Sequence, residues 1–257
     1  MKPLESTNLF ANGISKSFST PGTDTSLKVL EDIRFHIMEG EFVSILGPSG
    51  CGKSTFLNIL AGFEDSDSGK VACCGDPVKA PSPQRAVVFQ SPVLFPWLSV
   101  KNNILYGLKL RKEGKKGTED IASSYIKAVG LDGFEDYYPS QLSGGMQQRA
   151  ALARALVLRP KVLLMDEPFA SLDAQTRYSM QQLLLRLWEE YRHTVVFITH
   201  DVEEALLMSD RICIMSKRPG TIIEEMPVPF ARPRPLSLTG SREFSMLKNH
   251  ILERLMT

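Results

Sequence analysis

The stretch "GPSGCGKST", residues 47–55, constrains this chain more than any other part of its sequence. It fits the pattern G-x-x-x-x-G-K-[ST]; the apolar run "EFVSILG" leads into it and the helical pattern "KSTFLNILAG" leaves it. Glycines allow backbone N–H groups to close around phosphates, and a helix start adds the positive end of its dipole. The sequence therefore predicts an α/β chain in which a strand, this loop and a short helix bind a nucleotide.

The residues of this phosphate loop have separate expected roles. Lys53 supplies a positive charge to the β- and γ-phosphates, and the hydroxyl of Ser54 is a ligand for Mg²⁺. A glycine turn of purely structural importance is the alternative. The loop residues predicted to contact the nucleotide are Gly47, Pro48, Ser49, Gly50, Cys51, Gly52, Lys53, Ser54 and Thr55.

Two adjacent acids, Asp166 and Glu167, end the apolar run "VLLMDE". Charges that emerge from a core strand need partners, so packing explains them poorly. We expect Asp166 to hold Mg²⁺, directly or through water, and Glu167 to orient and polarise the attacking water. A solvated acidic strand end is the alternative.

Two further polar residues end apolar runs. His200 closes "VVFITH", and a contact with the γ-phosphate is predicted for it over a structural role, because ligands bind at the carboxyl ends of such strands. Gln90 ends "VVFQ" and is predicted to reach the metal or the water from a mobile loop, although by itself it carries little weight.

The stretch "LSGGMQQR", residues 142–149, places a serine and two glycines before a predicted helix. This is a second anion-binding helix start in a chain that already has a phosphate loop. One nucleotide bound to one chain does not need both.

Composition narrows the classes of partner. The net charge is +1, from 30 basic and 29 acidic residues, which gives no electrostatic footprint for nucleic acid or anionic lipid. No apolar run approaches the ~18 residues of a membrane helix, and "MKPLESTNLF" lacks the apolar stretch of a signal peptide. The chain is expected in the cytosol, with the adjacent Cys73 and Cys74 as reduced thiols rather than a bonded pair or a metal site.

The pattern of apolar and polar residues changes along the sequence. The first forty residues alternate apolar and polar side chains, which predicts antiparallel strands around the loop "STPGTDTS". Helical patterns dominate residues 91–150, with the polar linker "RKEGKKGTED" between two of them. "KVLLMDE" and "HTVVFITH" are typical of a parallel sheet covered on both faces. After a Pro-rich link, a last amphipathic helix is expected to pack on its own domain through Phe244, Leu247, Ile251 and Leu255.

Taken in order, these motifs and "SLD" (residues 171–173) resemble those of ATP-binding cassette (ABC) ATPases over residues 8 to 228. The "LSGGQ"-type signature is specific to that family, and this chain departs from it by having Met146 where glutamine is usual, with Gln147 next. The resemblance implies a P-loop cassette with a mixed core sheet, an N-terminal antiparallel β subdomain and a helical subdomain, with ATP and Mg²⁺ as cofactors. It implies three parts: a RecA-like ATP-binding core with the β subdomain in 1–90 and 151–230, the helical subdomain in 91–150, and a linker with the last helix in 231–257.

The resemblance also explains the second anion-binding device. Cassettes of this family pair head to tail, so Ser143, Gly144 and Gly145 would grip the γ-phosphate of ATP held by a partner cassette. By the same resemblance Asp173 would cross the dimer interface. Phe18 would stack on adenine; a core aromatic is the alternative for it.

Within the family, "FQSPVLFPWLSVKNNILYGLKL" and "KRPGTIIEEMPVPFARPRP" resemble ATPases of nitrate, sulfonate, taurine and bicarbonate importers, and pyrimidine-precursor importers share these marks. The implied partners are a second cassette, expected to be an identical copy, and membrane permease subunits that dock near Gln90, Pro96 and Trp97. A substrate-binding protein outside the membrane would act indirectly. Burial within the helical subdomain is the alternative for Pro96 and Trp97. The expected location is peripheral, at the cytoplasmic face of the cell membrane.

Two other classes compete with the importer. A soluble ABC ATPase of iron–sulfur cluster assembly is the main alternative, and a partner that is not a membrane protein would distinguish it. Nucleic-acid ATPases of the family usually carry two cassettes in one chain or a long coiled-coil insertion, and this sequence has neither. No residue of this chain is expected to recognise the cargo.

Overall fold

The computed structural model describes residues 7–19, 26–110 and 117–256. The chain forms two compact units: unit 1 comprises residues 1–82 and 194–257, and unit 2 comprises residues 83–193. These boundaries differ from those expected at residues 90, 150 and 230, and the three functional domains stay a prediction. Parts of the expected loop "STPGTDTS" and of the linker "RKEGKKGTED" lie outside the described residues.

Unit 1 begins with the predicted antiparallel sheet, which has the strand order β2-β1-β4-β5. Side chains alternate between buried and exposed positions along β2, because one face of the sheet packs on the core and the other meets water. Cys73 and Cys74 lie at the β4–β5 turn with no disulfide bond between them, their sulfur atoms 3.9 Å apart. The strands are β1 (Thr7–Ser19), β2 (Ser26–Met38), β4 (Ser68–Cys73) and β5 (Asp76–Pro77).

The core strands of unit 1 form a mixed arrangement. The central strand β3 pairs in parallel with β8 and β9, and β10 pairs antiparallel with β9. Every residue of β3 and of β8 is buried, which is why both read as nearly continuous apolar runs in the sequence, with Ser44 and Thr194 as their polar members. The strands are β3 (Phe42–Leu46), β8 (Thr194–Ile198), β9 (Arg211–Met215) and β10 (Ile222–Pro227).

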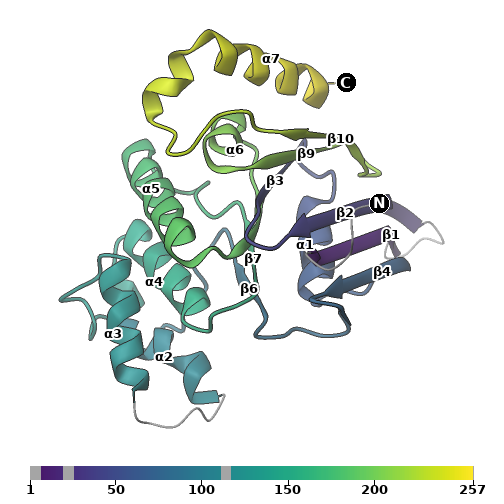
Figure 1. The fold of residues 1–257 in the computed structure, drawn as a ribbon. Helices are drawn as coiled ribbons and strands as arrows, with labels where there is room; N and C mark the ends of the chain where they lie inside the picture. The colour runs from purple at the N-terminus through teal and green to yellow at the C-terminus, as the bar shows by residue number, and fades with distance from the viewer. Residues whose placement is uncertain (1–6, 20–25, 111–116, 257) are drawn as a thin grey trace. The chain divides into compact units, whose positions relative to one another are not determined.

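The described part of unit 1 also contains three α-helices, α1 (Lys53–Ala61), α6 (Val202–Met208) and α7 (Arg242–Met256), and a 3-10 turn (Leu236–Gly240). The short α1 follows the phosphate loop and ends at Gly62, as the sequence predicts. The last helix, α7, packs on α6 and β9 and is drawn in yellow in Figure 1. It buries Phe244 and Ile251, and Lys248 forms an ion pair with Glu203 of α6.

Outside residues 111–116, unit 2 contains two parallel strands, four α-helices and a 3-10 turn. Strand β6 lies beside β7, α4 packs against β6, and α2 packs against both α3 and α4. The elements are β6 (Arg85–Val88), α2 (Val100–Leu110), α3 (Thr118–Ala128), a 3-10 turn (Pro139–Gln141), α4 (Gly144–Leu156), β7 (Val162–Asp166) and α5 (Ala174–Tyr191). None of the helices in the described part of the chain combines the length and the apolar character needed to cross a bilayer.

Candidate nucleotide site

The phosphate loop connects β3 to α1 in unit 1, and Lys53 closes it from inside. The Lys53 ammonium donates hydrogen bonds to the carbonyl oxygens of Gly47 and Pro48, at 2.7 and 3.0 Å, and the residue is only 6% exposed. Both acceptors are neutral, whereas a buried ammonium needs an opposite charge. An anionic phosphate bound in this loop would provide that charge.

The start of α1 is open to an anion. It follows Gly52 at φ +108°, a left-handed conformation that a residue with a side chain adopts with difficulty, and a Cβ there would lie 2.6 Å from Leu30. No side chain of the described residues caps this helix, and its first turn carries no acid. The orphan N–H groups and the positive dipole end are therefore available for phosphate oxygens. The exposed Ser54 offers a hydroxyl oxygen, a ligand type that Mg²⁺ prefers.

His200 and the phosphate loop lie at the same edge of the unit 1 sheet. Strands β3 and β8 are parallel neighbours with Ile45 opposite Ile198, and the loop and His200 each begin two residues later. His200 is exposed, and the next residue, Asp201, caps α6 by accepting hydrogen bonds from the amides of Glu203 and Glu204. The capped helix start fixes the backbone next to His200 while leaving its ring on the surface.

Phe18 lies near the end of β1 in unit 1, with 40% of its surface exposed. The Lys16 ammonium is 5.2 Å from the centroid of its ring. A core aromatic would be covered on both ring faces, so this exposure fits a ring that receives a flat ligand better than a ring that fills the core.

In unit 2 the two acids lie where β7 ends. Asp166 is the last residue of the strand, and Glu167 turns the chain sharply at φ +44°. A glutamate rarely adopts this left-handed conformation, and such outliers gather at functional sites. Gln90 lies at the same edge, because β6 pairs in parallel with β7 and Val88 is opposite Met165. The structure thus brings Gln90, Asp166 and Glu167 to one edge of the strand pair.

The signature segment starts α4 in unit 2. Ser143 is the N-cap residue, and its Oγ accepts a hydrogen bond from the amide of Met146 at 3.3 Å. Ser143 and Gly144 are exposed, whereas Gly145 is buried against Thr176 of α5, where a Cβ would lie 2.5 Å from Cγ2. The serine can still donate its own O–H to a ligand while it caps the helix.

The glutamine shifted by one position in this signature has a structural role. The Gln147 side chain donates hydrogen bonds to the carbonyls of Pro139 and Leu142, and so holds the loop that enters α4. The next residue, Gln148, is buried and donates to the carbonyl of Phe89, the residue before Gln90. We did not predict this link between the signature helix and the Gln90 loop, because nothing local in the sequence reports a contact across 59 residues.

Asp173 is the N-cap of α5. Its Oδ1 accepts hydrogen bonds from the amides of Gln175 and Thr176, at 3.1 and 3.0 Å, and hydrogen bonding by Thr176 holds the pKa of this carboxyl below its usual range. The carboxylate is exposed. Its place at an interface between cassettes stays a prediction.

The expected donors for Mg²⁺ are a hydroxyl, an amide and a carboxylate, from Ser54, Gln90 and Asp166. All three offer the hard oxygen ligands that Mg²⁺ takes. Among the described residues there is no group of three or more His, Cys, Asp or Glu side chains that could hold a metal ion. Mg²⁺ usually takes one or two carboxylates and completes its shell with phosphates and water.

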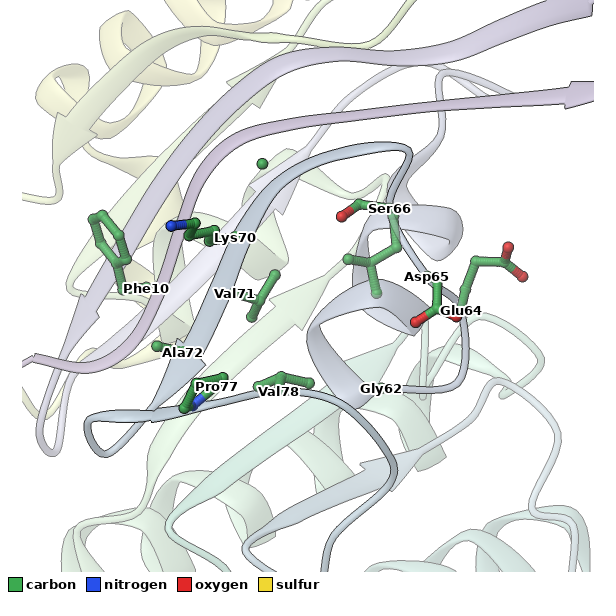
Figure 2. A pocket seen from close by; sticks show the side chains of 12 residues that line it. Phe10, Gly62, Glu64, Asp65, Ser66, Lys70, Val71, Ala72, Pro77 and Val78 are labelled. Atoms are coloured by element: carbon green, nitrogen blue, oxygen red, sulfur yellow. The ribbon is translucent and has the colours of Figure 1, made fainter.

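A separate cavity of about 460 Å³ lies in unit 1 between the end of α1 and strands β1, β4 and β5 (Figure 2). Its wall mixes the apolar Phe10, Val71 and Val78 with the charged Glu64 and Lys70. None of the residues predicted to contact the nucleotide lines this cavity. It is therefore distinct from the phosphate loop.

The sequence of this chain is similar to those of known proteins. The ABC transporter family matches residues 30–170. The chain is 43% identical over 245 residues to the aliphatic sulfonates import ATP-binding protein SsuB of Bacillus cereus, covering 95% of this chain and 94% of the relative. It is 45% identical over 224 residues to the taurine import ATP-binding protein TauB of Pelagibacter ubique, covering 87% and 84%.

Solved structures agree with the fold. A dimeric ATP-binding cassette in a post-hydrolysis state, bound to ADP and Pi, has a TM-score of 0.75 and 31% identity, and covers 87% of this chain and 100% of that one. The cassette cbiO1 of Clostridium perfringens, part of the transporter complex cbiONQ, has a TM-score of 0.78 and 25% identity, and covers 98% of both chains. The expected fold, with its antiparallel N-terminal sheet and mixed core sheet, is thus confirmed. This chain belongs to the ABC transporter family and is an ATPase of the ATP-binding cassette type.

Proposed function

We propose that this chain is the ATP-hydrolysing subunit of an importer for aliphatic sulfonates, taurine or a related small anion, with nitrate-type and pyrimidine-precursor importers in the same group. The observation that carries the proposal is its similarity, over 95% of its length, to an aliphatic sulfonates import ATP-binding protein. The taurine import protein of similar identity supports the same substrate class. The cargo itself would be recognised by the partner subunits.

In this proposal, residues at the two strand edges contribute to the binding and the hydrolysis of ATP. The loop backbone, the start of α1 and Lys53 bind the phosphates, and Phe18 stacks on the adenine. Ser54, Asp166 and Gln90 would hold Mg²⁺, which when bound would supply positive charge against the β- and γ-phosphates. Glu167 orients the attacking water and takes up its proton, and His200 contacts the γ-phosphate.

The signature segment would act on a second copy of the chain. Ser143 and Gly144 are exposed at the start of α4, where N–H groups and the helix dipole attract an anion. If the phosphate loop binds the chain's own ATP, a phosphate that binds these N–H groups would come from another cassette. The dimeric cassette of similar fold, bound to ADP and Pi, supports pairing of two copies. In this proposal the copies pair head to tail, and Asp173 would lie at their interface.

An aromatic cluster of unit 2 would dock the permease. Phe95 lies 4.5 Å from Tyr106 and 5.6 Å from Trp97 between ring centroids, and the Arg154 guanidinium lies 5.5 Å from the Phe95 ring. Trp97 is 70% exposed, so the cluster supports it from one side and leaves the other in solvent. An exposed tryptophan beside other aromatic side chains is typical of a protein interface. The chain would thereby be held at the cytoplasmic face of the membrane without spanning it.

The test is a pull-down from membranes with the wild-type chain and with Trp97→Ala, read by mass spectrometry. We expect a polytopic membrane protein to co-purify with the wild type and to be lost with the variant. Tyr178→Ala, which removes another exposed aromatic of unit 2, is the matched control and should retain the partner. Capture of soluble proteins alone would contradict the importer and favour the ATPase of iron–sulfur cluster assembly.

A further inference from the structure

The segment Lys217–Gly220, between β9 and β10, contacts the phosphate loop from outside. In the sequence, this "KRPG" stretch belongs to the segment that resembles a group of importer ATPases. In the structure Arg218 donates two hydrogen bonds to a single acceptor, the carbonyl oxygen of Gly50, from Nε at 3.0 Å and from Nη2 at 2.7 Å. A charged guanidinium thus holds one peptide group of the loop that is predicted to surround the phosphates.

The position of Arg218 is fixed by the residues that follow it. The amide of Gly220 donates to the carbonyl of Val29 at 2.8 Å, and its carbonyl accepts from the amide of Glu31 at 3.0 Å, so the segment is paired with β2. A Cβ on Gly220 would lie 2.2 Å from the carbonyl oxygen of Cys51. Only glycine allows the segment to approach the phosphate loop this closely.

The held carbonyl determines where the next N–H group points. A trans peptide group is planar, with its C=O and N–H on opposite sides. Because the Gly50 carbonyl faces Arg218, the N–H of Cys51 faces the other way, toward the carbonyl of Pro48 inside the loop at 3.3 Å. That bond is long, so the N–H can be given up to a phosphate oxygen at little cost. Gly50 itself adopts φ +75°. A glycine can adopt several other backbone conformations unless a contact with another residue holds it in one of them.

We propose that Arg218 is a positioning residue for ATP binding, which keeps the Gly50–Cys51 peptide turned so that its N–H points at the phosphates. It acts through the backbone and does not touch the nucleotide. The proposal depends on ATP binding by this loop, and it holds whichever cargo or permease the ATPase serves. All of its contacts lie within unit 1.

The test compares Arg218→Ala and Arg218→Lys with the wild type, by ATP dissociation constant, by KM and kcat for ATP hydrolysis, and by melting temperature. We expect Arg218→Ala to raise Kd and KM about 10-fold, the lower range for hydrogen bonds from a charged donor, because the site is exposed. The kcat at saturating ATP and the melting temperature should stay near wild type. Arg218→Lys keeps the charge and one donor, so its loss should be smaller.

Two controls separate positioning from a general effect on the fold. Arg242→Ala removes an exposed arginine from the first turn of α7 in the same unit and should leave Kd unchanged. Guanidinium ion at millimolar concentration should restore ATP affinity to Arg218→Ala and have no effect on the wild type, because it replaces the missing group. An unchanged Kd in Arg218→Ala would overturn the proposal. A raised Kd accompanied by a lowered melting temperature, with no recovery of affinity in guanidinium, would also overturn it. Failure of the wild type to bind ATP would instead contradict the ATPase itself.

Discussion

Two helix starts of this protein suit an anion, and they are built differently. Helix α1 follows a left-handed glycine, no side chain in the described part of the chain caps it, and the buried Lys53 closes the loop before it. Helix α4 follows Ser143, whose own side chain caps it, and it starts in solvent. The N–H groups of the first start have no side-chain cap before a phosphate binds, whereas in the second start Ser143 already caps the amide of Met146. This suits a permanent site in the same chain and an occasional contact with a partner.

The largest effect is expected at Glu167. Its loss should nearly stop ATP hydrolysis and so keep the start of α1 in one copy paired with the start of α4 in the other. Glu167→Gln removes the proposed base, so kcat should fall about 10²- to 10⁴-fold, while ATP still binds. Size-exclusion chromatography with ATP and Mg²⁺ should then show a dimer. A variant that stays monomeric at saturating ATP would contradict pairing through the signature segment.

Lys53→Ala should break the first helix start. Removing the buried ammonium takes away a charge that the phosphates need, so ATP affinity should fall about 100-fold, the upper range for charged hydrogen bonds. Titration with a fluorescent ATP analogue measures this. Lys70→Ala, at the separate cavity of unit 1, is the control and should bind ATP like the wild type. Similar losses in both variants would mean that the phosphates are bound elsewhere.

Gly145→Ala should disturb the second helix start through its packing. The added methyl group would overlap Thr176, so the free energy of unfolding should fall by about 1–3 kcal/mol, as for other overpacked cores. Urea unfolding measures the change. Gly144→Ala is the matched control, because no heavy atom of the described residues outside its immediate chain surroundings lies within 4 Å of its added Cβ. Equal stability of the two variants would show that α4 and α5 are not in close contact there.

Ser143 gives the smallest effect on stability and the sharpest comparison. Ser143→Ala removes the cap and should cost about 1 kcal/mol. Ser143→Asp keeps a good cap, so stability should be retained, but its negative charge would repel the γ-phosphate of a partner. In the Glu167→Gln background, the aspartate variant should therefore lose the ATP-dependent dimer. A dimer that persists would show that Ser143 does not face the partner's phosphate.

The parts of the site that follow from local sequence were predictable. The apolar runs predict β3, β7 and β8, because a strand buried on both faces has few polar positions. The polar residues at the ends of these runs mark the strand ends. The glycine and serine patterns predict both helix starts. The backbone conformation of Glu167, at φ +44°, could not be predicted from the motifs, because it depends on the residues that pack around it.

Contacts between distant segments were beyond the sequence. Arg218 reaches Gly50 across 168 positions. Arg234 is buried in the Pro-rich link, where it donates to the carbonyls of Leu206 and Ser209 at the end of α6. An arginine in a link reads as a solvated charge, and only the fold shows that it satisfies a helix end.

The bond between Gln148 and the carbonyl of Phe89 has a mechanical consequence. One buried amide joins the helix that would meet another cassette to the strand end that leads into the aromatic cluster. A small shift of α4 would therefore pull directly on the segment before Gln90, without having to pass through the apolar core. The start of α4, which would contact a second cassette, and the aromatic cluster, which would contact a permease, are thus mechanically coupled within unit 2.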